Sequence, residues 1–197
     1  MNYLEIIDKY YNEDNQLRYI FMTHSRLVTK RALKICDLHP ELNLNRRFVE
    51  EAAMLHDIGI IKCNAPGIYC FGSEPYLIHG RVGAEMMRAE GYPDHARVCE
   101  RHTGAGIGKE EIKRLELPLP YEDFLPETME EKVICYADKF YSKTHPEVDK
   151  SISKAENKKL KAKNIKLKSY YYLCRLNEEI FVYSNSVARC HVCYGGF

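Results

Sequence analysis

The sequence lacks any run of about 18 apolar residues, the length that a membrane-spanning helix needs. Its first segment, MNYLEIIDKYYNED, contains acidic residues and no long apolar stretch, which argues against a signal peptide. Internal repeats and low-complexity segments are also missing. These absences predict a cytoplasmic protein with no membrane partner. The 197 residues, 45% of them hydrophobic, suffice for the core of one domain of ordinary size.

The eight cysteines lack the spacing of a disulfide or zinc framework. Six of them are scattered, mostly within apolar stretches, and in a cytosolic protein they are expected to be reduced core residues. Cys190 and Cys193 form a lone CxxC near the end of the chain, and no second pair lies nearby to complete a zinc site. We expect a loose tail there, with structural zinc as the alternative.

Charge is nearly balanced at +1 but is unevenly distributed along the chain. Residues 1–150 hold 20 of the 29 Lys and Arg and 25 of the 28 Asp and Glu, so the remainder is strongly basic. This break predicts a domain of residues 1–150 and a basic helical extension with a loose tail over residues 151–197. The alternative is a nucleic-acid-binding arm. We favour the solvated face of one or two helices over residues 154–182, so nucleic acid is not an expected partner.

Alternation with a period of two is scarce and helical periodicity is common, so the predicted fold class is all-α. Residues 62–75 contain two glycines and two prolines and are predicted to form a loop. The predicted helices span residues 2–12, 22–37, 45–59, 76–90, 93–102, 109–116 and 128–141.

Histidine and aspartate recur beside the apolar faces of these helices. One such residue would ordinarily be a hydrogen-bonded core residue, but each buried polar group without a partner costs about 1–3 kcal/mol. A divalent cation would compensate several of them together, because imidazole and carboxylate are its ligands. Without thiolates, the set favours iron, manganese, zinc, magnesium or nickel over copper(I). The candidates are His24, His56, Asp57, His79, His102 and Asp138.

The ordered motifs LHDIG, HGRVGAEMMRAEG, ERHTGAGIG and MEEKVICYADKF resemble the HD-domain superfamily of metal-dependent phosphohydrolases over roughly residues 20–145. Small single-domain HDIG-type members are the most similar, and the pattern is similar also to bacterial HD-type diadenosine tetraphosphate hydrolases. The resemblance implies an HD-domain helical bundle. It also implies hydrolysis of a phosphate ester or anhydride of a nucleotide-like small molecule. A non-catalytic, metal-containing nucleotide-sensing module is the alternative.

Carried over residue by residue, the resemblance also implies a ligand set. It assigns His79 and His102 to a second metal ion that Asp57 bridges to the first, so we favour a binuclear site. The alternative for these two histidines is a hydrogen bond to substrate phosphate. The residues implied for the first ion are His24, His56, Asp57 and Asp138.

Many relatives carry a lysine directly after HDIG, where it can meet phosphate, but this chain has Ile60 there. Lys62 is one replacement, and the others are Arg81, Arg101, Lys139 and Lys143, although each is more commonly a surface charge. The implied chemistry is attack on phosphorus by a metal-activated hydroxide, with nearby cations meeting the transition-state charge. The predicted catalytic set is Asp57, Arg81, Arg101 and Lys139. Structural roles are expected for the remaining histidines, His39, His95, His145 and His191.

Overall fold

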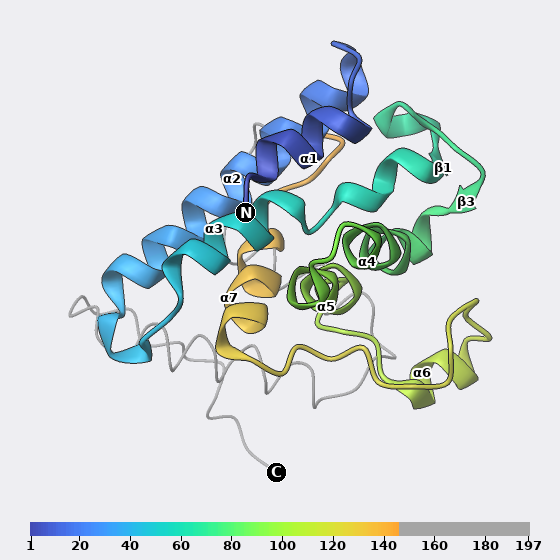
Figure 1. The fold of residues 1–197 in the computed structure, drawn as a ribbon. Helices are drawn as coiled ribbons and strands as arrows, with labels where there is room; N and C mark the ends of the chain where they lie inside the picture. The colour runs from blue at the N-terminus through green and yellow to red at the C-terminus, as the bar shows by residue number, and fades with distance from the viewer. Residues whose placement is uncertain (146–197) are drawn as a thin grey trace.

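The structure, a computed structural model, describes residues 1–145 and is mostly helical (Figure 1). The predicted all-α fold class is confirmed. The predicted boundary at residue 150, the helices over 154–182 and the CxxC pair lie outside the described residues. The α-helices are α1 (Tyr3–Tyr10), α2 (Gln16–Leu38), α3 (Arg46–Leu55), α4 (His79–Ala89), α5 (Pro93–Arg101), α6 (Lys109–Arg114) and α7 (Met129–Asp138).

Side-chain caps fix where three of these helices begin. The side chain of Asn15 accepts a hydrogen bond from the backbone of α2, and that of Asn45 does the same for α3. Thr128 and Glu131 form the predicted capping box of α7. These caps satisfy backbone N–H groups that have no partner within the helix.

Helix α3 ends at Leu55, earlier than the predicted end at Gly59. The chain then tightens into a 3-10 helix over Ile58–Lys62. His56 and Asp57 therefore lie at the junction of two helices rather than inside one. The apolar periodicity of this stretch could not distinguish the two helix types, because both bury the same residues.

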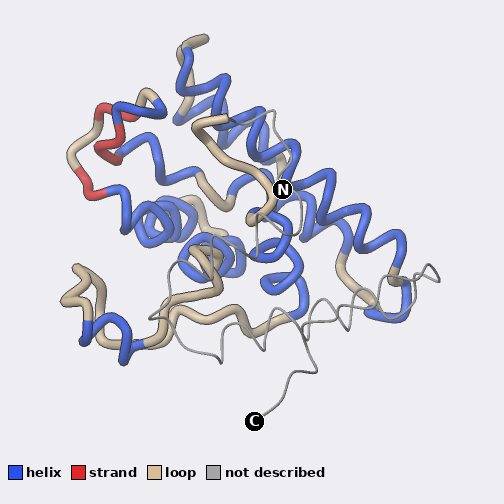
Figure 2. The backbone as a smooth tube through the Cα atoms, turned by 180° about the vertical axis from the view of Figure 1, so that it is seen from behind, coloured by secondary structure: helices blue, strands red, loops and turns tan. Residues whose placement is uncertain are grey.

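The predicted loop over residues 62–75 is partly a small sheet, which corrects that prediction. Its strands are β1 (Cys63–Ala65), β2 (Cys70–Phe71) and β3 (Glu74–Pro75). β1 lies in the centre, antiparallel to β2 and parallel to β3. Strands of two or three residues are too short to show alternation. Figure 2 shows them confined to one corner of an otherwise helical molecule.

The core has two main parts. One is packed around Phe21, Leu55 and Met87, and the other around Val28 and Ile134. Helix α2 packs against α3 and α7, while α4 packs against α5 and the 3-10 helix that follows Asp57. Among residues 1–145, no helix is both long and apolar enough to cross a membrane.

Gly59 lies where the chain beyond α3 meets α4. A Cβ atom at this position would lie 2.2 Å from the carbonyl oxygen of His79 and 2.4 Å from the amide nitrogen of Gly83. Both of these atoms belong to the backbone and cannot turn aside as a flexible side chain can. The glycine of the HDIG motif therefore allows α4, which carries His79, to approach Asp57 closely.

Replacing Gly59 with alanine is expected to destabilise the fold by about 1–3 kcal/mol, because the added methyl group forces two backbone segments apart. Denaturant unfolding of the metal-free protein measures this loss. Gly67→Ala is the matched control, since a Cβ atom there would meet nothing within 4 Å. The control should stay within about 0.5 kcal/mol of the parent protein. Equal stability of the two variants would contradict this role of Gly59.

Candidate metal centre

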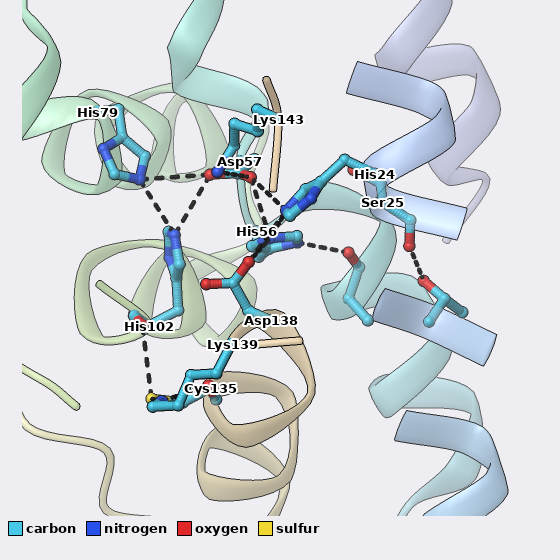
Figure 3. A network of polar contacts seen from close by, with 12 residues as sticks. His24, Ser25, His56, Asp57, His79, His102, Cys135, Asp138, Lys139 and Lys143 are labelled. Atoms are coloured by element: carbon cyan, nitrogen blue, oxygen red, sulfur yellow. Dashed lines mark hydrogen bonds and ion pairs between the residues drawn. The ribbon is translucent and has the colours of Figure 1, made fainter. Parts of the chain in front are cut away.

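The six predicted ligand residues converge on one buried cluster (Figure 3). All four histidines and Asp57 are at most 5% exposed, whereas the side chain of Asp138 is 18% exposed. The residues come from five α-helices or their ends. His24 comes from the middle of α2, His56 and Asp57 follow α3, His79 begins α4, His102 follows α5, and Asp138 ends α7.

Asp57 belongs to two groups of ligand atoms, and each of its carboxylate oxygens faces one of them. In the first group, Oδ2 lies 3.0 Å from Nε2 of His24 and 3.1 Å from Nε2 of His56. Asp138 completes this group with Oδ1 at 3.0 Å from Nε2 of His24. In the second group, Oδ1 of Asp57 lies 3.3 Å from Nε2 of both His79 and His102.

Three of the histidines are oriented in the same way by the backbone. Each occupies the position directly after a helix, which for His79 is a 3-10 helix over Tyr76–Ile78 that leads into α4. The Nδ1 atom of each donates a hydrogen bond to the carbonyl oxygen three residues earlier. Since a carbonyl can only accept, Nδ1 carries the hydrogen and Nε2 is left facing the cluster. The pairs are His56 with Ala53 at 2.7 Å, His79 with Tyr76 at 2.8 Å and His102 with Cys99 at 2.7 Å.

The second group fits a cation because it brings acceptors together. Burial lowers the pKa of His102 to about 4, outweighing the opposing effect of Asp57, so this imidazole is neutral near pH 7. Its Nε2 then presents a lone pair 3.1 Å from Nε2 of His79 and 3.3 Å from the Asp57 carboxylate. Such contacts between acceptors are unfavourable unless a cation lies among them.

The spacing of the ligand atoms also suits a divalent ion. Ligands held about 2.1 Å from one ion lie roughly 3.0–3.4 Å from each other. The distances given above are 3.0–3.3 Å, and that between Nε2 of His56 and Oδ1 of Asp138 is 3.6 Å. Helices α3, α5 and α7 direct their C-terminal ends at the cluster, and these ends carry partial negative charge that favours a cation. Both groups therefore fit divalent metal ions, and the individual ligand roles remain predictions.

Two of the predicted catalytic cations have other partners. The Arg81 guanidinium is paired with Glu85 at 3.1 Å, and its side chain is 42% exposed. Arg101 donates to the Leu125 carbonyl at 2.9 Å and pairs with Glu127 at 2.7 Å. These contacts connect α5 to the segment before α7. Both guanidinium groups thus contact residues outside the cluster, and the catalytic role of Arg81 and Arg101 remains a prediction.

Lys139 and Lys143 follow Asp138 but differ in position. Nζ of Lys139 turns back to the carbonyl oxygen of Cys135 at 2.5 Å and to its sulfur at 3.1 Å. Nζ of Lys143 instead lies 2.6 Å from Oδ2 of Asp57. The sequence named Lys143 only as one of several replacement cations, because a residue in a turn has no periodicity to mark it. Lys62 is exposed.

The other histidines within the described residues have roles outside the cluster. His39 is buried and pairs with Glu41 at 2.9 Å. His95 is buried between the rings of Phe48 and Tyr92. His145 falls at the end of the described residues and His191 beyond them.

The sequence model of the family described as HD domain matches residues 21–142, more than half of the chain. This chain belongs to the HD-domain family. That superfamily consists generally of metal-dependent phosphohydrolases, and the cluster of histidine and aspartate in this HD domain is compatible with divalent metal ions. No experimentally solved structure matches the chain.

Curated relatives of this HD domain carry different names. A tRNA (cytidine(56)-2'-O)-methyltransferase of Picrophilus torridus is 34% identical over 163 residues, which are 82% of this chain and 41% of the relative. The enzyme of the same name in Thermoplasma volcanium is 31% identical over 71% of this chain and 35% of its own length. An uncharacterised protein of Methanocaldococcus jannaschii is 39% identical over 56% of this chain and 59% of its own length. The chain thus spans less than two thirds of each relative.

Substitutions are expected to separate the two ligand groups. His102→Gln should lower the metal content from two equivalents to one by disrupting the second group, and Asp138→Ala should do so by disrupting the first. Asp57→Ala should remove both ions, because its carboxylate belongs to each group. Elemental analysis after dialysis against excess Mn²⁺ and then metal-free buffer measures the content. His39→Gln, which changes a buried histidine outside the cluster, should bind metal like the parent. Unchanged content in Asp57→Ala would contradict the assignment.

Metal affinity is expected to rise with pH. Burial opposes the charged form of His56, but Asp57 and Asp138 raise its pKa to about 10, so this imidazole is protonated near pH 7 in the metal-free protein. A metal ion needs the unprotonated nitrogen, and binding must release that proton. Between pH 6 and 8, affinity should therefore increase by up to about tenfold per pH unit for each proton released. Titration calorimetry in buffers of different ionisation enthalpy counts the protons, and a count of zero would refute this.

Proposed function

We propose that this HD domain is a metal-dependent phosphohydrolase that cleaves a phosphate ester or anhydride of a nucleotide-like small molecule. The observation that carries the proposal is the buried Asp57 carboxylate, whose two oxygens face two groups of ligand atoms at 3.0–3.3 Å. A structural ion needs one closed set of ligands, whereas two sets sharing a carboxylate are typical of sites for hydrolytic attack on phosphorus.

The residues of this chain supply binding, orientation and charge. His24, His56 and Asp138 with Asp57 would hold one ion, and His79 and His102 with Asp57 the other. When bound, such ions supply Lewis acidity and a water molecule of lowered pKa. The backbone carbonyls that accept a hydrogen bond from Nδ1 fix three of the four imidazoles, those of His56, His79 and His102, before any ligand arrives.

Substrate access is expected on the side of Asp138. Its side chain is 18% exposed and that of Lys143 is 12% exposed, while those of His24 and His56 are 1% or less. A phosphoryl group approaching from this side would meet the ligand groups and a lysine ammonium together. Positive charge on this side would stabilise the negative charge that develops on the phosphoryl oxygens in the transition state.

The names of the relatives point to RNA as a second source of substrate. Two relatives are named for methyl transfer to a tRNA cytidine, and this chain matches 41% and 35% of their lengths. The imidazole and carboxylate cluster suits a metal ion rather than a methyl group. We therefore assign hydrolysis, and not methyl transfer, to this HD domain. An RNA-derived phosphoester is accordingly the second substrate candidate.

A substrate panel on metal-loaded protein tests the proposal. It should contain bis(p-nitrophenyl) phosphate, p-nitrophenyl phosphate, nucleoside monophosphates, diadenosine tetraphosphate and short RNAs with terminal phosphates, each with Mn²⁺. We expect hydrolysis of at least one class, removed by chelation and lowered at least about 100-fold by Asp57→Asn, since catalysis depends on the ions that Asp57 holds. Bound metal without turnover of any compound would contradict the hydrolase and favour the nucleotide-sensing module.

A further inference from the structure

Lys143 is the basic residue that reaches the metal centre. Its ammonium lies 2.6 Å from Oδ2 of Asp57, and its side chain is 12% exposed (Figure 3). The same ammonium also acts electrostatically on the Asp138 carboxylate. The basic residues of the predicted catalytic set, Arg81, Arg101 and Lys139, contact residues outside the cluster.

Tyr76 connects this lysine to the second ligand group. Its ring stacks on the imidazole of His79, with centroids 4.8 Å apart and planes at 17°. Its backbone carbonyl accepts the hydrogen bond from Nδ1 of the same histidine. Its hydroxyl interacts electrostatically with the ammonium of Lys143, whose Nζ lies 6.0 Å from the ring centroid. Tyr76 thus lies beside both the ammonium and a ligand imidazole.

The ammonium and the metal ions have the same sign of charge and share one carboxylate. Once cations occupy the groups around Asp57, the attraction between this carboxylate and Lys143 is largely offset by repulsion from the ions. A nearly buried ammonium then needs another anionic partner, because an unpaired charge in this setting is costly. A phosphoryl oxygen held at the ions supplies that partner at the required place.

We propose that Lys143, positioned by Tyr76, forms the phosphoryl-oxygen subsite of this centre. The inference rests on the proposed function. The residue directly after HDIG is Ile60, which carries no charge. In the proposed subsite, the positive charge comes instead from Lys143 in the segment after α7. Lys143 binds a non-bridging oxygen of the substrate, and Tyr76 acts as a positioning residue through its hydroxyl.

Inorganic phosphate is the probe, because its binding to the Mn²⁺-loaded protein can be measured by calorimetry without any turnover. Lys143→Met keeps the length of the side chain and removes the charge, and should weaken phosphate binding about 10- to 100-fold, as expected for a lost charge-assisted hydrogen bond. Lys143→Arg should restore part of the affinity. Tyr76→Phe keeps the stacked ring and should weaken binding about 3- to 10-fold while metal content stays unchanged.

Lys30→Ala on the exposed face of α2 is the control for loss of one positive charge, and its phosphate affinity should match that of the parent. Lys62→Ala tests the rival lysine near HDIG. Unchanged phosphate affinity in Lys143→Met with full metal content overturns the subsite, as does a larger loss in Lys62→Ala. If Lys143→Met fails to fold or to load metal, Lys143→Gln and Tyr76→Phe decide by the same measurement.

The two proposals fail in different ways. Phosphate binding that depends on Lys143, without turnover of any compound in the panel, would contradict the proposed hydrolase activity and support the anion subsite. If Lys143→Met changes neither turnover nor phosphate affinity, the result would support the hydrolase activity and contradict the subsite.

Discussion

The carboxylate of Asp57 is fully buried, and a buried charge is costly unless positive groups or hydrogen-bond donors surround it. Here the surrounding groups come from several helices and from the turn after α7. Imidazoles arrive at one carboxylate oxygen from α2 and the end of α3, and an ammonium arrives there from the turn after α7. The other oxygen faces the second ligand group, where neutral His102 leaves a place for a cation. The ammonium of Lys143 helps to hold the pKa of Asp57 well below its usual range despite the burial. The bundle is thus organised around one negative charge.

This dependence explains why packing and chemistry are linked in the HDIG motif. Its histidine and aspartate supply ligand atoms, whereas its glycine supplies only the absence of a side chain where α4 passes. Ile58, between them, is fully buried in the core. Each residue of the motif therefore meets a different requirement. The chemistry of His56 and Asp57 depends on the close approach of α4 that Gly59 allows.

The ligand-type residues could be found from sequence because each lies on or beside the apolar side of a helix, where a polar side chain is conspicuous. Lys143 could not be singled out, since it lies in a turn and reaches Asp57 from 86 positions along the chain. The strands were missed because two or three residues show no alternation. Hydropathy likewise gave no sign that α3 ends before His56, because Ile58 and Ile60 are buried whichever helix type contains them. The family places this fold among metal-dependent phosphohydrolases, but a shared fold leaves the substrate to the walls of the site.

The orientation of three imidazoles by carbonyls three residues earlier has an evolutionary consequence. In many metal sites a carboxylate side chain holds the distal ring nitrogen, and a mutation can remove it. Here the partner is the main chain, which every amino acid possesses, so no substitution at Ala53, Tyr76 or Cys99 deletes the acceptor. The vulnerable quantity is spacing. One residue inserted between Ala53 and His56 would turn the histidine by about 100° around the helix axis. Related sequences should therefore tolerate amino-acid substitutions in these turns far better than insertions or deletions.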